Sequence, residues 1–220
     1  MGHVTDARDL GDVPEGMNPD ARETWPSQEL INSWLGDFDF ELRPGEPSHI
    51  DPQDADAVER ARAFRDVLGR FCTGVTVVSA ISGGAPVGMT CQSFSSVSLS
   101  PPLVLFCPAK TSRAWPLIQR SGSFCVNLLA DGQHELSNVM ATKGIDKFAD
   151  LEWEPAPRTG SPVLKGVLGF VDCTIQAVHE AGDHFVVIGR VQELASYGEA
   201  VDPLLFFEGR YRSAAGLPPA

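Results

Sequence analysis

The sequence lacks the features of a membrane, nucleic-acid or zinc protein. No apolar run approaches the roughly 18 residues of a membrane span, and the N-terminus has no basic segment followed by an apolar one. The formal net charge is −12, so a basic face for nucleic acid is not expected. No CxxC pair occurs, and the spacing of histidine and cysteine offers no zinc site. We therefore expect a cytoplasmic protein that binds no metal, membrane or nucleic acid.

Three common catalytic motifs are also missing. There is no GxGxxG motif and no GxxxxGK[ST] motif, so neither a Rossmann dinucleotide site nor a P-loop is expected. There is no GxSxG elbow either. A Ser-His-Asp hydrolase stays open on residue types alone.

The acidic residues are concentrated at the N-terminus. Residues 1–60 hold 15 Asp/Glu and 4 Lys/Arg, whereas the rest of the chain is nearly neutral. Large apolar side chains follow in residues 21–50, and a solubilising tail would not need them: Trp25, Leu30, Ile31, Trp34, Leu35, Phe38 and Phe40. We expect residues 1–55 to form an acidic, partly ordered arm that packs on the body or on a second subunit. Residues 56–220 are expected to form one domain.

The five cysteines are scattered, at positions 72, 91, 107, 125 and 173, and all but Cys91 lie in apolar stretches. Their odd number and spacing favour buried, reduced thiols over a disulfide framework.

Beyond the arm, the pattern indicates one helix and then many strands. Residues 53–70 are predicted to be helical, with Val58, Ala61, Phe64, Val67 and Leu68 on one stripe. Further helices are predicted over 111–120 and 133–140. Strands are predicted over 73–80, 86–90, 103–107, 123–129, 167–180, 185–194 and 204–211. This order favours a mainly β fold, a closed β-barrel with peripheral helices.

Three stretches carry the candidate chemistry. Hydroxyl side chains crowd Gly88–Val104, and such a segment offers N–H and hydroxyl groups to a polar planar ligand. Residues Lys110–Arg113 precede a predicted helix start, which suits a phosphate. His184 lies at the mouth of a predicted hairpin. The alternatives are a serine-rich loop with its own turns, a capped helix with solvated charges, and a histidine that only occupies a turn.

Together these stretches resemble the flavin reductase family with the FMN-binding split-barrel fold. The chain is similar in particular to reductase components of two-component flavin monooxygenases that act on aromatic and steroid-derived phenols. The resemblance covers roughly residues 60–212, and the 1–55 arm departs from the family pattern. The matching stretches are Arg65–Val75, Gly88–Val104, Leu105–Trp115, Phe124–Leu128, Asp146–Phe148, Gly182–Val191 and Pro203–Arg212.

The resemblance implies three groups of site residues. The flavin ring would be lined by Pro86, Val87, Gly88, Met89, Thr90, Gln92 and Ser93. The ribityl phosphate end would be held by Cys107, Pro108, Ala109, Ser112, Arg113 and Ala114, with added contacts from Val139 and Met140. The nicotinamide would be faced by His184, Val201, Asp202, Pro203 and Tyr211, with His184 as the candidate for a direct catalytic role.

The implied function is that of an NAD(P)H:flavin oxidoreductase, a homodimer that takes FMN or FAD and NADH or NADPH. It would supply reduced flavin, by diffusion, to a partner monooxygenase. Hydride transfer needs two stacked rings rather than an acid–base residue. Three alternatives stay open: a flavoprotein that keeps its FMN and reduces an organic substrate directly, a non-catalytic flavin-binding protein, and an assembly protein with a vestigial barrel.

Overall fold

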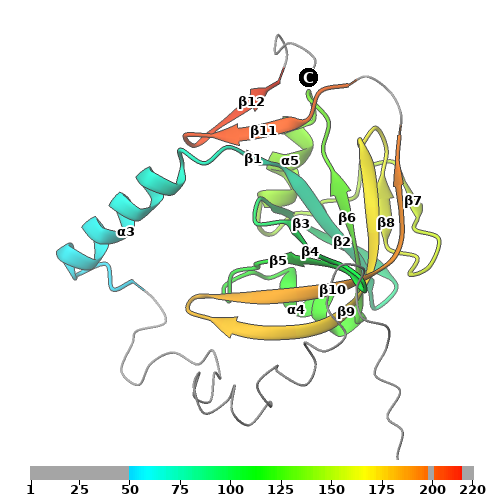
Figure 1. Ribbon diagram of the computed structural model, residues 1–220, viewed down its shortest axis with the longest axis horizontal. Helices are drawn as coiled ribbons and strands as arrows, with labels where there is room; N and C mark the ends of the chain where they lie inside the picture. Colours follow the sequence, from blue (N-terminus) through cyan, green and yellow to red (C-terminus); the bar gives the residue numbers. More distant parts are fainter. Residues whose placement is uncertain (1–49, 198–200, 215–220) are drawn as a thin grey trace, which may run out of the picture. The chain divides into compact units, whose positions relative to one another are not determined.

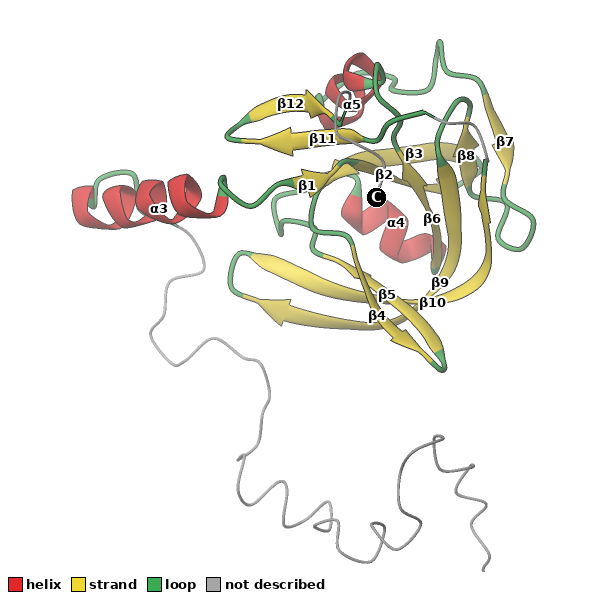
Figure 2. Ribbon diagram, turned by 45° about the horizontal axis from the view of Figure 1, so that its top comes forward, coloured by secondary structure: helices red, strands yellow, loops and turns green. Residues whose placement is uncertain are grey.

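The computed structural model describes residues 50–197 and 201–214. The predicted arm, residues 1–55, lies almost entirely outside this range. The described chain opens with helix α3 (Ala55–Leu68), which Asp54 caps by accepting a hydrogen bond from the Ala57 N–H. Helix α3 has no buried residue, and it projects from the sheets in both views (Figures 1 and 2). Its predicted apolar stripe is therefore solvent-exposed, with Phe64 and Val67 at 65% and 69%.

Seven strands form the main sheet, in the order β3-β2-β6-β9-β10-β5-β4, and every neighbouring pair is antiparallel. The prediction of a mainly β fold is confirmed. Within the described residues no ladder joins β3 to β4, so the sheet is split-barrel-like rather than closed. The strands are β2 (Thr76–Ser82), β3 (Ala85–Cys91), β4 (Ser95–Leu99), β5 (Pro102–Phe106), β6 (Ser123–Leu128), β9 (Gly169–Ala181) and β10 (His184–Ser196).

Two smaller sheets accompany the main one. Strand β1 (Thr73–Gly74) pairs with β11 (Leu204–Phe207), which pairs with β12 (Arg210–Ser213). Strands β7 (Trp153–Pro155) and β8 (Pro162–Leu164) form the other sheet. The β11–β12 hairpin lies beside α5 (His134–Ala141) in Figure 1.

Helices α4 (Trp115–Ser121) and α5 pack on the end of the sheet that carries β2 and β3. The prediction placed the start of α4 at residue 111, but the helix begins at Trp115, with Pro116 in its first turn and with Trp115 and Ile118 buried. Proline is favoured there because first-turn N–H groups have no partner within the helix. The four residues before Trp115 consequently form a turn that faces the site described below.

The long β9–β10 hairpin changes register between Ile188 and Gly189. A Cβ atom at Gly189 would overlap the Phe124 ring, so only glycine lets the strand approach that side chain. The tip of the hairpin reaches the segment after β5: Lys110 N donates to Asp183 O at 2.8 Å, and Phe185 N donates to Pro108 O at 2.9 Å. The fold thus joins two of the three candidate stretches.

All five cysteines are free. Cys91, Cys125 and Cys173 are buried, as predicted for structural thiols, and burial raises the pKa of Cys173 to about 12. The expectation fails at Cys72, which is exposed because it lies in the link from α3. No helix among residues 50–197 and 201–214 has the length and apolarity to cross a bilayer.

Candidate functional site

A cavity of about 530 Å³, called here the β3 cavity, opens beside β3. Its volume lies within the range of small-molecule sites. Three segments enclose it: one from β3, one from the turn before α4, and the loop that follows α5. Ten of the predicted site residues line it: Pro86, Val87, Gly88, Met89, Thr90, Ala109, Ser112, Arg113, Ala114 and Met140.

Strand β3 ends the main sheet, so one of its edges has no strand partner among the described residues. The Gly88 carbonyl points away from β2, because it accepts a hydrogen bond from Lys147 Nζ at 3.1 Å. Outward-facing backbone groups recur at every second residue of an antiparallel strand, so the N–H groups of Gly88 and Thr90 share this edge. A planar heterocycle with carbonyl and nitrogen acceptors fits such a row of donors.

Gly88 also sets how closely the opposite wall approaches. A Cβ atom there would lie 3.1 Å from Met140 Sδ and 3.3 Å from Phe148 Cζ. Both side chains belong to the wall formed by α5 and its following loop. Glycine at position 88 thus lets this wall pack directly on β3.

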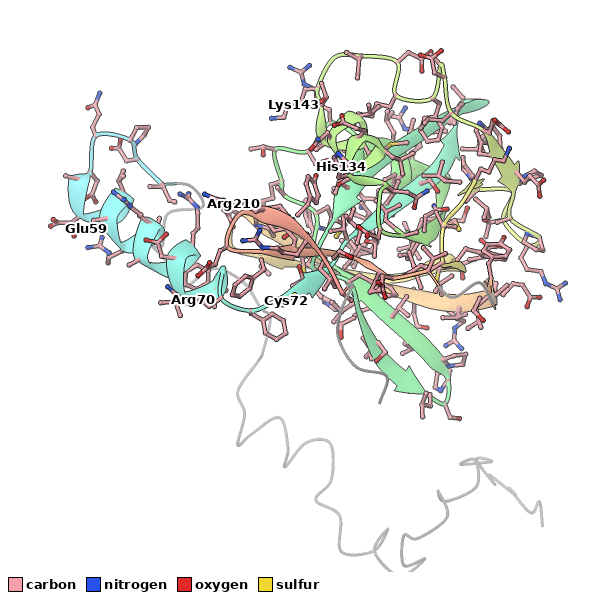
Figure 3. The ribbon with its side chains drawn as sticks, turned by 90° about the horizontal axis from the view of Figure 1, so that it is seen from above. Glu59, Arg70, Cys72, His134, Lys143 and Arg210 are labelled. Atoms are coloured by element: carbon pink, nitrogen blue, oxygen red, sulfur yellow. The ribbon has the colours of Figure 1, made fainter. Side chains whose placement is uncertain are left out.

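Three cations line the β3 cavity: Arg113, Lys143 and Lys147. Within the described chain, no carboxylate lies within the 4.0 Å ion-pair distance of any of them. The one carboxylate in the lining, Asp146, accepts a hydrogen bond from the Phe148 N–H at 3.1 Å instead. Lys143 lies close to α5 in Figure 3. Cations without carboxylate partners suit an anionic ligand such as a phosphate.

The predicted phosphate stretch is only partly available. Lys110 donates to Glu180 at 2.7 Å and lies over the Phe185 ring, so its charge is already paired. The Ser112 hydroxyl accepts a hydrogen bond from the Trp115 N–H at 3.2 Å. The N-cap residue itself, Ala114, makes no side-chain cap hydrogen bond. Within the described chain Arg113 is left as the cation of this segment without a carboxylate partner.

His184 lies beside the β3 cavity rather than in its lining. It forms a β-bridge with Ala109, which does line the cavity. Its Nδ1 atom lies 2.7 Å from Asp183 Oδ1, and this hydrogen bond lowers the pKa of the Asp183 carboxyl. The imidazole is held in place while its side chain stays 45% exposed.

Five predicted flavin contacts are not part of the lining: Gln92, Ser93, Cys107, Pro108 and Val139. Ser93 Oγ accepts a hydrogen bond from Cys107 N at 2.8 Å, so these two residues fix the turn below Ala109. Burial raises the pKa of Cys107, which disfavours a reactive thiolate there.

The other predicted nicotinamide contacts lie outside the β3 cavity. Val201 lines a different cavity, Asp202 O accepts from Asp131 N at 2.7 Å, and Pro203 bridges Ala130. Tyr211 Oη donates to Ser137 Oγ at 3.0 Å and to Asn138 Oδ1 at 2.9 Å. The reason is topological: β11 and β12 pair with β1, and Tyr211 thereby braces α5 instead of facing the cavity.

The sequence interpretation missed the wall formed by residues 141–148, together with Leu117. A signal was present, because Asp146–Phe148 is one of the stretches that carry the resemblance, although no role was given to it. Gly144 has a φ of 81°, which marks a tight loop between α5 and this motif.

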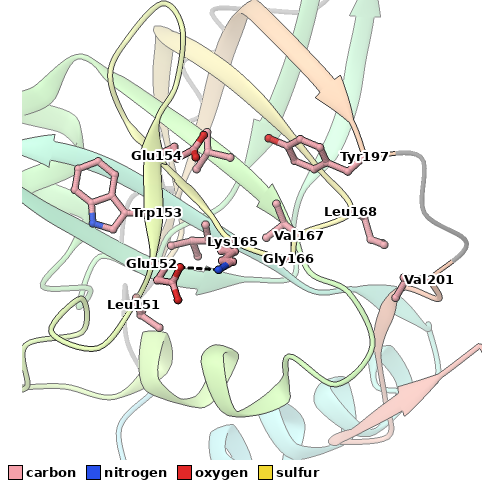
Figure 4. Close-up of a pocket in the computed structure, with 12 residues that line it drawn as sticks. Leu151, Glu152, Trp153, Glu154, Lys165, Gly166, Val167, Leu168, Tyr197 and Val201 are labelled. Atoms are coloured by element: carbon pink, nitrogen blue, oxygen red, sulfur yellow. Dashed lines mark hydrogen bonds and ion pairs between the residues drawn. The ribbon is translucent and has the colours of Figure 1, made fainter.

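A second cavity of about 650 Å³, called here the β7–β8 cavity, lies beside those two strands and Tyr197 (Figure 4). Although it is larger, its one lining cation, Lys165, is paired with Glu152 at 2.7 Å. Glu154 adds a second carboxylate to the lining. This cavity is therefore poorly suited to an anion.

Comparisons with known proteins found relatives of this chain. Residues 68–215 match the family model described as flavin reductase like domain. The chain is 51% identical over 165 residues to the reductase subunit HsaB of a flavin-dependent monooxygenase from Rhodococcus jostii, a match covering 75% of this chain and 82% of that protein. It is 42% identical to the NADH-dependent FMN reductase SmoA of Agrobacterium fabrum, over 70% of this chain and 86% of SmoA.

Among solved structures, the chain is similar to a homologue of nitrilotriacetate monooxygenase component B from Mycobacterium thermoresistibile. The TM-score is 0.71 at 47% identity, and the match covers 76% of this chain and 93% of that one.

Proposed function

Because this chain belongs to the flavin reductase family, we propose that its β3 cavity binds the flavin that a nicotinamide nucleotide reduces. The chain is an NAD(P)H:flavin oxidoreductase, and its function is to supply reduced flavin to a partner monooxygenase. One observation carries the placement of the site: within the described chain, the β3 cavity combines a free strand edge with a cation that has no carboxylate partner, Arg113.

FMN is the flavin that fits this donor set, with FAD as the alternative. The β3 edge at Gly88 and Thr90 would hold the polar side of the ring, and Arg113 with Thr111 would hold the phosphate. We expect a dissociation constant in the micromolar range or below, of order −8 kcal/mol. NADH is the expected nicotinamide, since a relative 42% identical to this chain is named for that reductant.

Bound flavin supplies the acceptor for a hydride from the nicotinamide. The protein's own task is to orient two rings and exclude water, which needs binding groups rather than an acid–base pair. His184 lies beside Ala109 at the rim, where it can contact the nucleotide through the ring nitrogen that Asp183 leaves free. We assign it a role in nucleotide positioning.

A homodimer is the assembly that the exposed face of α3 supports. Phe64, Val67 and Leu68 expose 54% or more of their surface on this helix, and an apolar stripe of this kind is stabilised by burial against a second copy. The five free cysteines are consistent with a cytoplasmic location.

Sedimentation of a variant that carries both Phe64→Glu and Val67→Glu tests the assembly. We expect a shift from dimer to monomer with an unchanged circular dichroism spectrum. Arg62→Glu, an exposed change on the opposite side of the same helix, is the matched control. A double variant that stays dimeric would exclude α3 as the interface.

The function itself is tested by NADH oxidation without any organic substrate. We expect oxidation to depend on added FMN and cytochrome c behind a dialysis membrane to be reduced, because the reduced flavin leaves the protein. NADH consumption that requires an added enone or quinone, with no reduction of cytochrome c, would favour a flavoprotein that keeps its FMN. FMN binding without any NADH oxidation would favour a non-catalytic binding protein.

A further inference from the structure

Lys147 joins two walls of the β3 cavity. Its Nζ atom donates to Gly88 O on β3 at 3.1 Å and to Met140 O in the last turn of α5 at 2.6 Å. The residue belongs to the loop after α5, lines the cavity and is half-buried. It therefore fixes the distance between the strand edge and the facing wall.

The charge of Lys147 is not balanced by a carboxylate. Both of its hydrogen-bond partners are neutral carbonyls, and within the described chain no carboxylate lies within ion-pair distance. Its neighbour Asp146 is bonded to the Phe148 N–H. Burial of the ammonium lowers the pKa of Lys147, because a charged group loses hydration there.

The end of α5 compensates only part of this charge. The last carbonyls of a helix carry a partial negative charge, and Met140 O is one of them. An ammonium has three N–H groups, and only two of them have an acceptor in the described chain. A donor and a net positive charge are thus left at the cavity wall.

We propose that Lys147 makes the β3 cavity bind reduced flavin more tightly than oxidised flavin. This inference rests on the proposed function. Transfer of a hydride from NADH adds two electrons and one proton to the neutral oxidised ring, leaving NAD⁺ and a reduced ring with one negative charge. With the ring along the β3 edge as proposed above, that charge would form near the Gly88 carbonyl, to which Lys147 Nζ donates. The ammonium stabilises the product state and leaves the neutral oxidised ring nearly unaffected.

The flavin phosphate is a second anionic group that Lys147 could contact. A comparison of FMN with riboflavin distinguishes a contact with the phosphate from an effect on the reduced ring. Riboflavin has the same ring without the phosphate. A preference for the reduced ring acts on FMN and riboflavin alike, whereas a phosphate contact acts on FMN alone and equally in both redox states.

The experiment measures the affinities of oxidised and reduced FMN, the latter under anaerobic conditions, for the wild type and for Lys147→Met. The ratio of reduced to oxidised affinity is expected to fall about tenfold in the variant, as for loss of one partly screened charge pair. A tenfold change corresponds to about 30 mV in the two-electron potential of the bound flavin. Riboflavin should show the same change, and Lys147→Arg should stay within about twofold of the wild type.

Lys165→Met in the β7–β8 cavity is the matched control and should leave the ratio unchanged. If Lys147→Met does not fold, Lys147→Gln removes the charge and keeps a donor, and the same ratio is measured. If the affinities for reduced and oxidised FMN fall equally, so that their ratio stays constant, the proposal is overturned, and Lys147 only holds the two cavity walls together. An effect on FMN but not on riboflavin would overturn it in favour of a phosphate contact. Failure of the wild type to bind FMN would overturn the proposed function itself, so the two failures are distinguishable.

Discussion

The β3 cavity is the smaller of the two cavities but the better suited to an anionic ligand. The β7–β8 cavity is larger, about 650 Å³ against 530 Å³, yet its lysine is already paired with Glu152. The β3 cavity contains three cations without a carboxylate partner among the described residues. A site for an anionic ligand is therefore recognised by cations and hydrogen-bond donors without partners, and not by its volume.

The strand edges do not account for this contrast. In the described chain β3 pairs with β2 alone, and β7 and β8 pair only with each other, so each of these strands has one unpaired edge. The difference between the two cavities therefore lies in their charged side chains. Four substitutions test whether flavin binding follows this division.

Arg113→Ala should give the largest effect. Loss of a charge-assisted bond to phosphate weakens binding by roughly 1.5–3 kcal/mol, about ten- to a hundredfold. Titration with FMN and with riboflavin checks this, because riboflavin affinity should change little. Lys165→Ala, in the other cavity, is the control. Equal losses for the two flavins would mean that Arg113 does not contact the phosphate.

Gly88→Ala should have the next largest effect. The added Cβ meets Met140 Sδ at 3.1 Å and the Val78 carbonyl at 3.3 Å, and overpacking costs about 1–3 kcal/mol. We expect a lower melting temperature and FMN affinity reduced several-fold. Gly74→Ala, which meets nothing within 4 Å, is the control. If the Gly88→Ala protein is less stable but keeps its FMN affinity, position 88 does not contribute to the flavin site.

His184→Ala should change catalysis by a smaller factor. The residue lies at the rim beside Ala109 and outside the cavity lining. We expect a Michaelis constant for NADH raised a few-fold, by roughly 1 kcal/mol or less, with FMN affinity within twofold. His179→Ala on β9 is the control. A collapse of FMN affinity would place His184 in the flavin site or in the fold.

Glu152→Gln should have the smallest effect. The Glu152–Lys165 pair is exposed, with side chains 75% and 71% accessible, and such pairs contribute about 0–1 kcal/mol. Thermal unfolding and FMN titration should both match the wild type closely. A marked loss of FMN affinity would show that the β7–β8 cavity takes part in binding and would remove the distinction between the two cavities.

The amino-acid sequence by itself determined most of the architecture. Segments rich in Val and Thr, apolar runs and the turn residues between them predicted the strands that became β2, β3, β5 and β6. Stretches that overlap β3, β5 and β6 carried the resemblance to flavin reductases, and ten of the predicted residues meet in one cavity. Local patterns are enough for such inferences, since each depends on neighbours in the chain.

The tertiary structure alone decided which charges stay available. Lys110 and Arg113 are alike as basic residues of one stretch, but the β9–β10 hairpin brings Glu180, 70 residues away, onto Lys110 only. Lys147 reaches Gly88 across 59 residues, and Tyr211 turns toward α5 because β12 pairs with β11. A side chain's electrostatic role depends on the partners that folding brings near it, and those partners are distant in sequence. The physical reason is that Coulomb and hydrogen-bond energies depend on separation in space, which no local pattern of residues specifies.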